Sequence, residues 1–348
     1  MPELRTDWLT GRSVLVAENR ALRPNEFAEG SFAVLSASIA PLGRTLSTCP
    51  FCAGNESCTP PAVYEQCDGD GNWRLRVVPN AFPAVFNLSG AGNANGTDTA
   101  AFPAVGLSEK WQLNIPIPGV HEVIIESPFH AERMTEVSQP QLYEIIRAYA
   151  TRLRHWRERE SLCYGLVFKN QGSKAGASLT HVHSQLIALP FIPPSVEAEI
   201  RRAAHFFETD EKCAYCDLID QERTLGSRIV FDADGFVAFC PFASLQPHEV
   251  WLMPCEHRAS FELASTSDLK QLAVILHRLL AKLESVIPHL QYNLLLRTAP
   301  WADNYDAAYH WRIELLPRVN SLAGLEMAAG VHINPVPPEK AALQLRSA

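Results

Sequence analysis

Three polar side chains suited to phosphate chemistry lie at alternate positions of one short segment. His181, His183 and Gln185 are each two residues apart, so a strand would place all three on one face. Residues 170–178, just before them, are rich in Gly and Ser, and the backbone amides of such a loop can approach a phosphate closely. A neutral imidazole beside that phosphate could attack it and form a covalent phosphoramidate. The segment therefore predicts a histidine nucleophile that acts on a nucleotide.

The structural alternative is a pair of histidines on a half-buried strand, satisfied by hydrogen bonds. For two histidines without context this alternative would be favoured. A nucleophilic histidine also needs its second ring nitrogen held by an acceptor such as a backbone carbonyl. The small-residue loop, Gln185 and a metal-ligand pattern elsewhere in the chain favour the chemical interpretation.

That metal-ligand pattern consists of two Cys-x-x-Cys pairs in a chain with nine cysteines. An odd count without an export signal argues against a disulfide scaffold, and this spacing is typical of zinc ligands. Four protein ligands close a tetrahedral site and leave no open position, so both sites would be structural. The predicted ligands are Cys49, Cys52, His130 and His181 in the first half of the chain, and Cys213, Cys216, His257 and His310 in the second.

Short sequence motifs that occur in both halves of the chain, in the same order, predict an internal duplication. The two Cys pairs correspond, and His121 with His130 matches His248 with His257, each nine residues apart. His183 precedes Pro190 by seven residues, as His310 precedes Pro317. This last match places His310 opposite His183 rather than His181, although either register could deliver an imidazole to a metal.

The elements expected around these residues are β-strands with one long helix in each half. Apolar residues at three- and four-residue intervals predict helices over 139–160 and 266–286, and a linking helix over 193–208. Strands are expected over 73–78, 163–168 and 292–296. The fold class is α+β, with duplicated units of antiparallel sheet and packed helices. We expect the first unit, which carries the nucleophile, to span residues 1–195 and the second to span 196–348.

Composition excludes several classes of protein. The 348 residues include 30 Lys and Arg against 38 Asp and Glu, a formal charge of −8, with no basic block for a nucleic-acid backbone. With 47% apolar residues the chain can bury a substantial core. No stretch approaches the roughly 18 apolar residues of a membrane helix, and the start lacks the pattern of a signal peptide. We therefore expect a globular cytoplasmic protein that binds neither nucleic acid nor membrane.

Over nearly its whole length the chain resembles the galactose-1-phosphate uridylyltransferase family, the transferase branch of the histidine-triad superfamily. The motifs on which the resemblance rests are residues 19–24 (NRALRP), 49–52 (CPFC), 79–85 (PNAFPAV), 126–130 (ESPFH), 168–185 and 324–326 (GLE). The resemblance implies a pair of histidine-triad half-barrels in each subunit and a homodimer. It also implies two zinc sites per chain, with iron as an option at the second.

The resemblance implies a role for each matching residue. His183 would be the nucleophile that becomes nucleotidylated, and Gln185 would donate a hydrogen bond to the phosphate oxygens. The residues implied in substrate binding are Arg20 and Arg23 at the phosphates, Asn80 and Asn170 at the nucleotide, Ser178 on the phosphate side and Glu326 at the sugar hydroxyls.

Two departures concern the substrate. Uridylyltransferases commonly carry His-Pro-His-Gly-Gln, whereas this chain has Val182 and Ser184 in that word. In three features the chain is similar to the ADP-sugar phosphorylase branch: the motif of residues 181–185, the later Asn334-Pro335 and the second Cys pair. Ser184 in place of Gly is expected to alter the room and the hydrogen bonding at the phosphate.

Three functions follow as hypotheses. The first is a ping-pong nucleotidyltransferase, with UDP-glucose and galactose 1-phosphate as the leading pair and ADP-glucose with phosphate as the alternative. The second, from a different class, is a zinc-stabilised nucleotide-binding module without turnover, which would form no covalent adduct. The third, a histidine-triad hydrolase, is disfavoured because such enzymes carry a third His where Gln185 stands.

Overall fold

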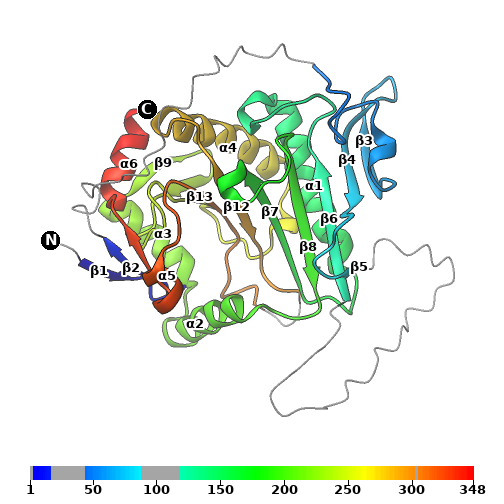
Figure 1. The fold of residues 1–348 in the computed structure, drawn as a ribbon. Helices are drawn as coiled ribbons and strands as arrows, with labels where there is room; N and C mark the ends of the chain where they lie inside the picture. Colours follow the sequence, from blue (N-terminus) through cyan, green and yellow to red (C-terminus); the bar gives the residue numbers. More distant parts are fainter. Residues whose placement is uncertain (1–2, 17–43, 88–117, 302–304) are drawn as a thin grey trace.

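The computed structural model describes residues 3–16, 44–87, 118–301 and 305–348. An 11-stranded sheet with helices packed on it forms the body of the molecule, and a three-stranded sheet lies beside it (Figure 1). The strands are β1 (Glu3–Thr6), β2 (Ser13–Val16), β3 (Tyr64–Cys67), β4 (Trp73–Pro79), β5 (Phe86–Asn87), β6 (Pro118–Ile125), β7 (Tyr164–Gln171), β8 (His183–Leu189), β9 (Ile229–Ala233), β10 (Phe236–Phe239), β11 (Val250–Pro254), β12 (Tyr292–Arg297), β13 (Arg312–Pro317) and β14 (Val331–Asn334). The helices are α1 (Gln139–Arg157), α2 (Pro194–Asp210), α3 (Ala214–Leu225), α4 (Thr266–Val286), α5 (Gly324–Ala329) and α6 (Pro338–Ser347).

The strand order of the large sheet shows the duplication. The order is β3-β4-β6-β8-β7 followed by β12-β13-β11-β10-β9, so the second half repeats the first in mirror order. The ladders along this path are antiparallel, and each half contributes one long helix, α1 or α4. The expected α+β class is confirmed. Pairing of β7 with β12 joins the two expected sheets into one, and the division of the chain at 195/196, which falls in the first turn of α2, stays a prediction.

The sheet register corrects one of the sequence matches. His181 lies two residues before His183, the first residue of β8. His310 likewise lies two residues before Arg312, the first residue of β13. Arg312 therefore occupies the position of His183, and the match of His183 with His310 through their prolines is wrong. The reason is that Pro190 and Pro317 mark only where the strands end, and the two strands differ in length.

The match of His121 with His248 is wrong by one residue. Val123 of β6 pairs with Gln185, and Trp251 of β11 pairs with Glu314, which occupies the position of Gln185. Two residues earlier in the chain, Glu249, just before β11, therefore corresponds to His121 of β6. His248 itself lies before β11 in a left-handed conformation, with φ +60°.

One face of the large sheet carries the main apolar core. α1 and α4 pack against each other and against this face. Both helices begin where the sequence provides an N-cap: the Ser138 hydroxyl accepts from the Gln141 amide, and Ser265 forms a capping box with Asp268. Within the described ranges, no helix is both long enough and apolar enough to cross a membrane.

The opposite face of the second half is filled by a buried ionic network beside α2 and α3. Arg312, which is fully buried, forms ion pairs with Glu199 of α2 at 2.7 Å and with Glu314 at 2.6 Å. Arg12 bridges Glu314 and Glu249 at 2.9 and 3.1 Å. Charges in such a network compensate one another, whereas removing one partner would leave a buried charge unpaired. The position that corresponds to the nucleophile is therefore occupied by a structural arginine.

Candidate active site

The first Cys2His2 group joins a loop to the end of β6 and the start of β8. Cys49 and Cys52 lie in tight turns that precede β3, His130 follows β6, and His181 precedes β8. The ligand atoms of these four residues all lie within 4.8 Å of one another. Their convergence from segments up to 132 residues apart ties the Cys loop to the strand that carries His183.

The atoms of this group fit a tetrahedral metal. Zn–S and Zn–N bonds of about 2.3 and 2.0–2.1 Å separate a sulfur from a nitrogen by about 3.6 Å. The Nδ1 atom of His181 lies 3.4 and 3.6 Å from the sulfurs of Cys49 and Cys52, and Nδ1 of His130 lies 3.6 Å from Cys52. The outer nitrogen of His181 donates to the carbonyl of Ser127 at 2.9 Å, the usual support for a metal-bound imidazole. A backbone amide, from Leu46, donates to the sulfur of Cys52.

The second Cys2His2 group has the same arrangement in the second half. Cys213 and Cys216 lie at the start of α3, where Cys213 is the N-cap, while His257 follows β11 and His310 precedes β13. Their ligand atoms also lie within 4.8 Å of one another. The sulfur of Cys216 is 3.4 and 3.6 Å from Nδ1 of His257 and His310. Both groups could hold a metal such as zinc.

The ring of His183 is held in the orientation that a nucleophile needs. Its Nδ1 lies 2.7 Å from the carbonyl oxygen of His181. Because a carbonyl only accepts, Nδ1 carries the proton, and the neutral ring has its lone pair on Nε2. The Phe51 ring packs edge-on against the imidazole, with centroids 5.3 Å apart. The Cys loop thus supplies Phe51, and the metal ligand His181 supplies the acceptor.

Burial keeps this imidazole uncharged. The His183 side chain is 7% exposed, and burial, with the nearby positive charge of Lys169, lowers the pKa of His183 below that of an ordinary histidine. At neutral pH the ring is therefore unprotonated at Nε2. A neutral, oriented imidazole can attack a phosphorus atom without first losing a proton.

A buried polar cluster lies behind β8, on the face covered by α1. Lys169 of β7 donates to the carboxylate of Glu126 at 2.6 Å and to the backbone carbonyl of His183 at 2.9 Å. Tyr149 of α1 donates to Glu126 at 2.7 Å, and Ser184 donates to the same oxygen. Burial opposes a charge on Glu126, but Lys169 and the hydroxyl donors hold its pKa below the usual value.

The position of Ser184 corrects an expectation. Since side chains alternate along β8, Ser184 faces away from Gln185 and His183, and it is fully buried against Tyr149 and Glu126. The expected effect of this serine on the room and the hydrogen bonding at the phosphate is therefore wrong. The serine completes the cluster that supports the strand from behind.

We predict that Lys169→Met destabilises the protein by about 3–5 kcal/mol, because it leaves the Glu126 carboxylate buried without its cation. Both side chains are at most 1% exposed, so water cannot compensate. Chemical denaturation measures the effect, and Lys340→Met, at an exposed position, is the control. A loss no larger than that of the control would contradict the assigned role of the ion pair.

Gln185 lies on the same strand face as His183 and is bonded to His121 of β6. The Oε1 atom of Gln185 is 2.8 Å from Nε2 of His121 and 3.4 Å from Nδ2 of Asn80. The other polar atom of Asn80, Oδ1, accepts from the amide of Phe82 at 2.9 Å. In the sequence, His121 stands out only through the match between the two halves, and nothing there indicates this contact because the two residues are 64 positions apart.

The remaining predicted residues are placed as follows. Asn170, at the end of β7, accepts from Asn293 of β12 at 2.8 Å, and Ser178 lies exposed in the loop before β8. Glu326 caps its own helix by accepting from the amides of Ala323 and Ile333. Helix α5, which contains Glu326, lies beside the small sheet and away from β8, the strand that begins at His183 (Figure 1). Arg20 and Arg23 lie outside the described residues.

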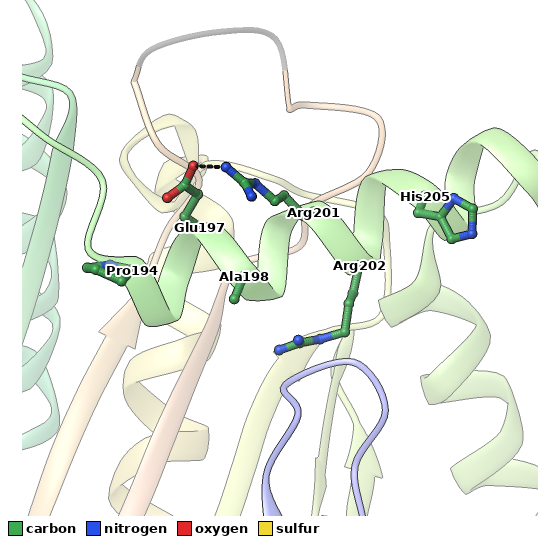
Figure 2. A pocket seen from close by; sticks show the side chains of 6 residues that line it. All are labelled: Pro194, Glu197, Ala198, Arg201, Arg202 and His205. Atoms are coloured by element: carbon green, nitrogen blue, oxygen red, sulfur yellow. Dashed lines mark hydrogen bonds and ion pairs between the residues drawn. The ribbon is translucent and has the colours of Figure 1, made fainter.

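A pocket on α2 is separate from these groups. Figure 2 shows it lined by six side chains of that helix, with Arg201 paired to Glu197 at 2.5 Å. None of the residues predicted to carry chemistry lines this pocket. The candidate active site is therefore the face of β6 and β8 that holds His183, Gln185 and His121.

Comparison with known proteins decides the family. The family model for the N-terminal domain of galactose-1-phosphate uridyl transferase matches residues 1–193, which include the first Cys2His2 group and His183. The chain belongs to this family. A second family model, for a domain of unknown function, matches residues 119–346.

Individual relatives in this family carry two different names. ADP-glucose phosphorylase of Arabidopsis thaliana is 32% identical over 99% of this chain and 92% of its own length. The galactose-1-phosphate uridylyltransferase of Thermotoga maritima is 28% identical over 66% of this chain and 74% of its own. The crystal structure of the Arabidopsis phosphorylase with bound ADP-glucose matches with a TM-score of 0.81 and 30% identity, covering 100% of this chain and 99% of that one. A uridylyltransferase structure matches with a TM-score of 0.71 and 27% identity, covering 100% and 98%.

Proposed function

We propose that the protein is a nucleotidyltransferase that uses His183 as its nucleophile and a nucleoside-diphosphate sugar as its donor. The observation that carries the proposal is the hydrogen bond from Nδ1 of His183 to the carbonyl of His181, which leaves a lone pair on Nε2. Membership of the family, with its uridylyltransferase and phosphorylase relatives, supports the reaction class.

The reaction has two displacement steps. In the first, Nε2 of His183 attacks the α-phosphorus, the bond from this phosphorus to the bridging oxygen breaks, and sugar 1-phosphate leaves with the electron pair. In the second, a phosphate oxygen of the acceptor attacks the same phosphorus, and the N–P bond breaks to return the neutral imidazole. The amide of Gln185 donates to the phosphate oxygens in both steps without competing as a base.

The metal groups serve as supports in this scheme. A bound metal would fix Cys49, Cys52, His130 and His181 together, and a closed four-ligand site leaves no position for substrate. We propose zinc at both groups. His181 then holds the carbonyl that orients the nucleophile.

ADP-glucose with inorganic phosphate is the donor and acceptor pair that we propose first. The phosphorylase relative matches this chain over almost its full length, and its structure with ADP-glucose matches the whole fold. UDP-glucose with galactose 1-phosphate is the second candidate, because the matching family model of residues 1–193 is that of a uridyl transferase.

The test is an isotope-exchange experiment with both donors. Purified protein is incubated with ADP-glucose or UDP-glucose and labelled glucose 1-phosphate, with no second acceptor. A two-step mechanism transfers label into the nucleotide sugar that serves as donor, because the nucleotide stays covalently bound to the enzyme and can react back with the labelled glucose 1-phosphate. Adding phosphate or galactose 1-phosphate then identifies the acceptor. Absence of exchange with either donor, or steady release of nucleoside monophosphate to water, would contradict the proposal.

A homodimer, the state predicted from the resemblance, would give Glu326 a route to the sugar. Since Glu326 and His183 lie apart within one subunit, they could act together only across two subunits. A cytoplasmic location also stays a prediction.

A further inference from the structure

His121 connects the backbone of one loop to the side chain of Gln185. The backbone amide of Ala84 donates to Nδ1 of His121 at 3.0 Å. A backbone N–H is always a donor, so Nδ1 must carry a lone pair. In the neutral ring the proton is then on Nε2. Burial lowers the pKa of His121, which favours this neutral form.

This tautomer determines which way the Gln185 amide points. Nε2–H of His121 needs an acceptor, and the Gln185 atom at 2.8 Å from it must therefore be the carbonyl oxygen. Asn80 gives the same answer. Its Oδ1 is taken by the amide of Phe82, so its Nδ2 is a donor, and that donor lies 3.4 Å from the same Gln185 oxygen. Nδ2 also lies 3.1 Å from Nε2 of His121, but both nitrogens are donors in this tautomer, so they do not bond to each other. Two donors converge on one carbonyl oxygen with two lone pairs.

The opposite orientation of the Gln185 amide would be unfavourable for both its amino group and its oxygen. A flipped Gln185 would turn its amino group toward the N–H of His121 and the amino group of Asn80. It would also present its oxygen to the negatively charged phosphate oxygens. In the observed orientation, the amino group of Gln185 forms no hydrogen bond with the part of the protein that the structure describes. It is available to a phosphate oxygen.

We propose that His121 is a positioning residue that fixes the amide of Gln185, so that its amino group faces the phosphate attacked by His183. This inference rests on the proposed function and adds a residue to it. The proposed role of His121 is indirect, since its ring contacts the side chain of Gln185. It acts through Gln185, and the Ala84 amide sets its tautomer.

The second half of the chain shows what the arrangement requires. There Glu249 occupies the position of His121 and Glu314 that of Gln185, and both carboxylates bind Arg12 at 3.1 and 2.9 Å. In the first half, Gln185 thus has a neutral histidine donor, His121, beside it. In the second half, Glu314 is instead paired with Arg12 and Arg312, and Arg312 stands where the first half has the nucleophile.

The first experiment reads the tautomer in the wild-type protein. Long-range ¹H–¹⁵N correlation spectra of ¹⁵N-histidine-labelled protein distinguish a protonated from an unprotonated ring nitrogen, and the His121 signals are those missing from His121→Gln. We expect protonated Nε2 and unprotonated Nδ1 at neutral pH. A ring protonated at Nδ1 overturns the inference whether or not the enzyme is active.

The second experiment is a double-mutant cycle on the rate of nucleotide transfer to the protein in a single turnover. His121→Phe removes the hydrogen bonds of the ring to Ala84 and Gln185 at similar volume, and we expect the transfer rate to fall about 10–100-fold. This is less than the roughly 10²–10³-fold expected for loss of the donor itself in Gln185→Ala. In the Gln185→Ala background, His121→Phe should change the rate less than about 2-fold, because its target is absent. His121→Gln, which places an amide donor where Nε2 was, should recover most of the wild-type rate.

Binding separates positioning from a general structural role. In the His183→Ala background, which cannot react, His121→Phe should leave the affinity for the donor sugar nucleotide within about 3-fold. Equal penalties from His121→Phe with and without Gln185, or no recovery in His121→Gln, overturn the inference while the wild-type enzyme still forms adduct. A wild type that forms no adduct with either donor contradicts the proposed function itself.

Discussion

His183→Ala is expected to form no nucleotidyl adduct and to lose at least about 10⁴-fold in turnover with either donor. The proposed reaction has no route that bypasses the nucleophile, and removal of a covalent nucleophile leaves only the contribution of binding and phosphate contacts. Quenched-flow measurement with a donor labelled in the α-phosphate reports the adduct and the turnover in one experiment.

The control for this substitution is His205→Ala. His205 is an exposed histidine of α2 and lines the pocket in Figure 2, away from β8. It should keep wild-type activity and melting temperature. An active His183→Ala enzyme, or an inactive His205→Ala enzyme, would place the reaction elsewhere in the molecule.

Disruption of the two metal groups is expected to have different consequences. Cys52→Ser and Cys216→Ser should each lower stability by about 3–5 kcal/mol, which corresponds to a fall in melting temperature on the order of 10 °C, because metal binding contributes directly to folding. Cys52→Ser should also reduce adduct formation at least 10-fold. The reason is that the first group contains His181, whose carbonyl accepts the Nδ1 proton of His183. Cys216→Ser should leave the adduct rate of the folded protein nearly unchanged.

Metal content, differential scanning calorimetry and the single-turnover rate measure these effects together. Cys58→Ser, at an exposed cysteine outside both groups, is the matched control and should change none of them. Equal activity losses from the two ligand substitutions would mean that the first group has no special connection to the nucleophile. Full metal content in both variants would contradict the ligand assignments.

The features that could be predicted from the sequence are those with a local signal. The helix expected over 266–286 is α4 with the same bounds, because Ser265 caps a long amphipathic repeat. The eight predicted ligands lie in two groups of four. They could be predicted because the Cys-x-x-Cys spacing and the repeated His motifs can be read directly from the sequence. Helix α3 was not predicted, because its short repeat begins inside the second Cys pair.

The features that could not be predicted depend on contacts between distant strands. His121 meets Gln185 only because β6 pairs with β8, and Arg312 takes the place of His183 only in the sheet register. The side of the strand that Ser184 occupies depends on which face α1 covers. The buried pair of Lys169 and Glu126 has no motif, because its two residues are 43 positions apart.

The most direct test of the account is to isolate the covalent intermediate. Wild-type protein is incubated with ADP-glucose or UDP-glucose without acceptor, quenched, and analysed by intact mass and by peptide mapping. The account predicts an acid-labile mass increase of one nucleoside monophosphate on His183 that disappears when phosphate or a sugar 1-phosphate is added. A protein that turns over its donor with no adduct, or with the nucleotide on a residue other than His183, would contradict it.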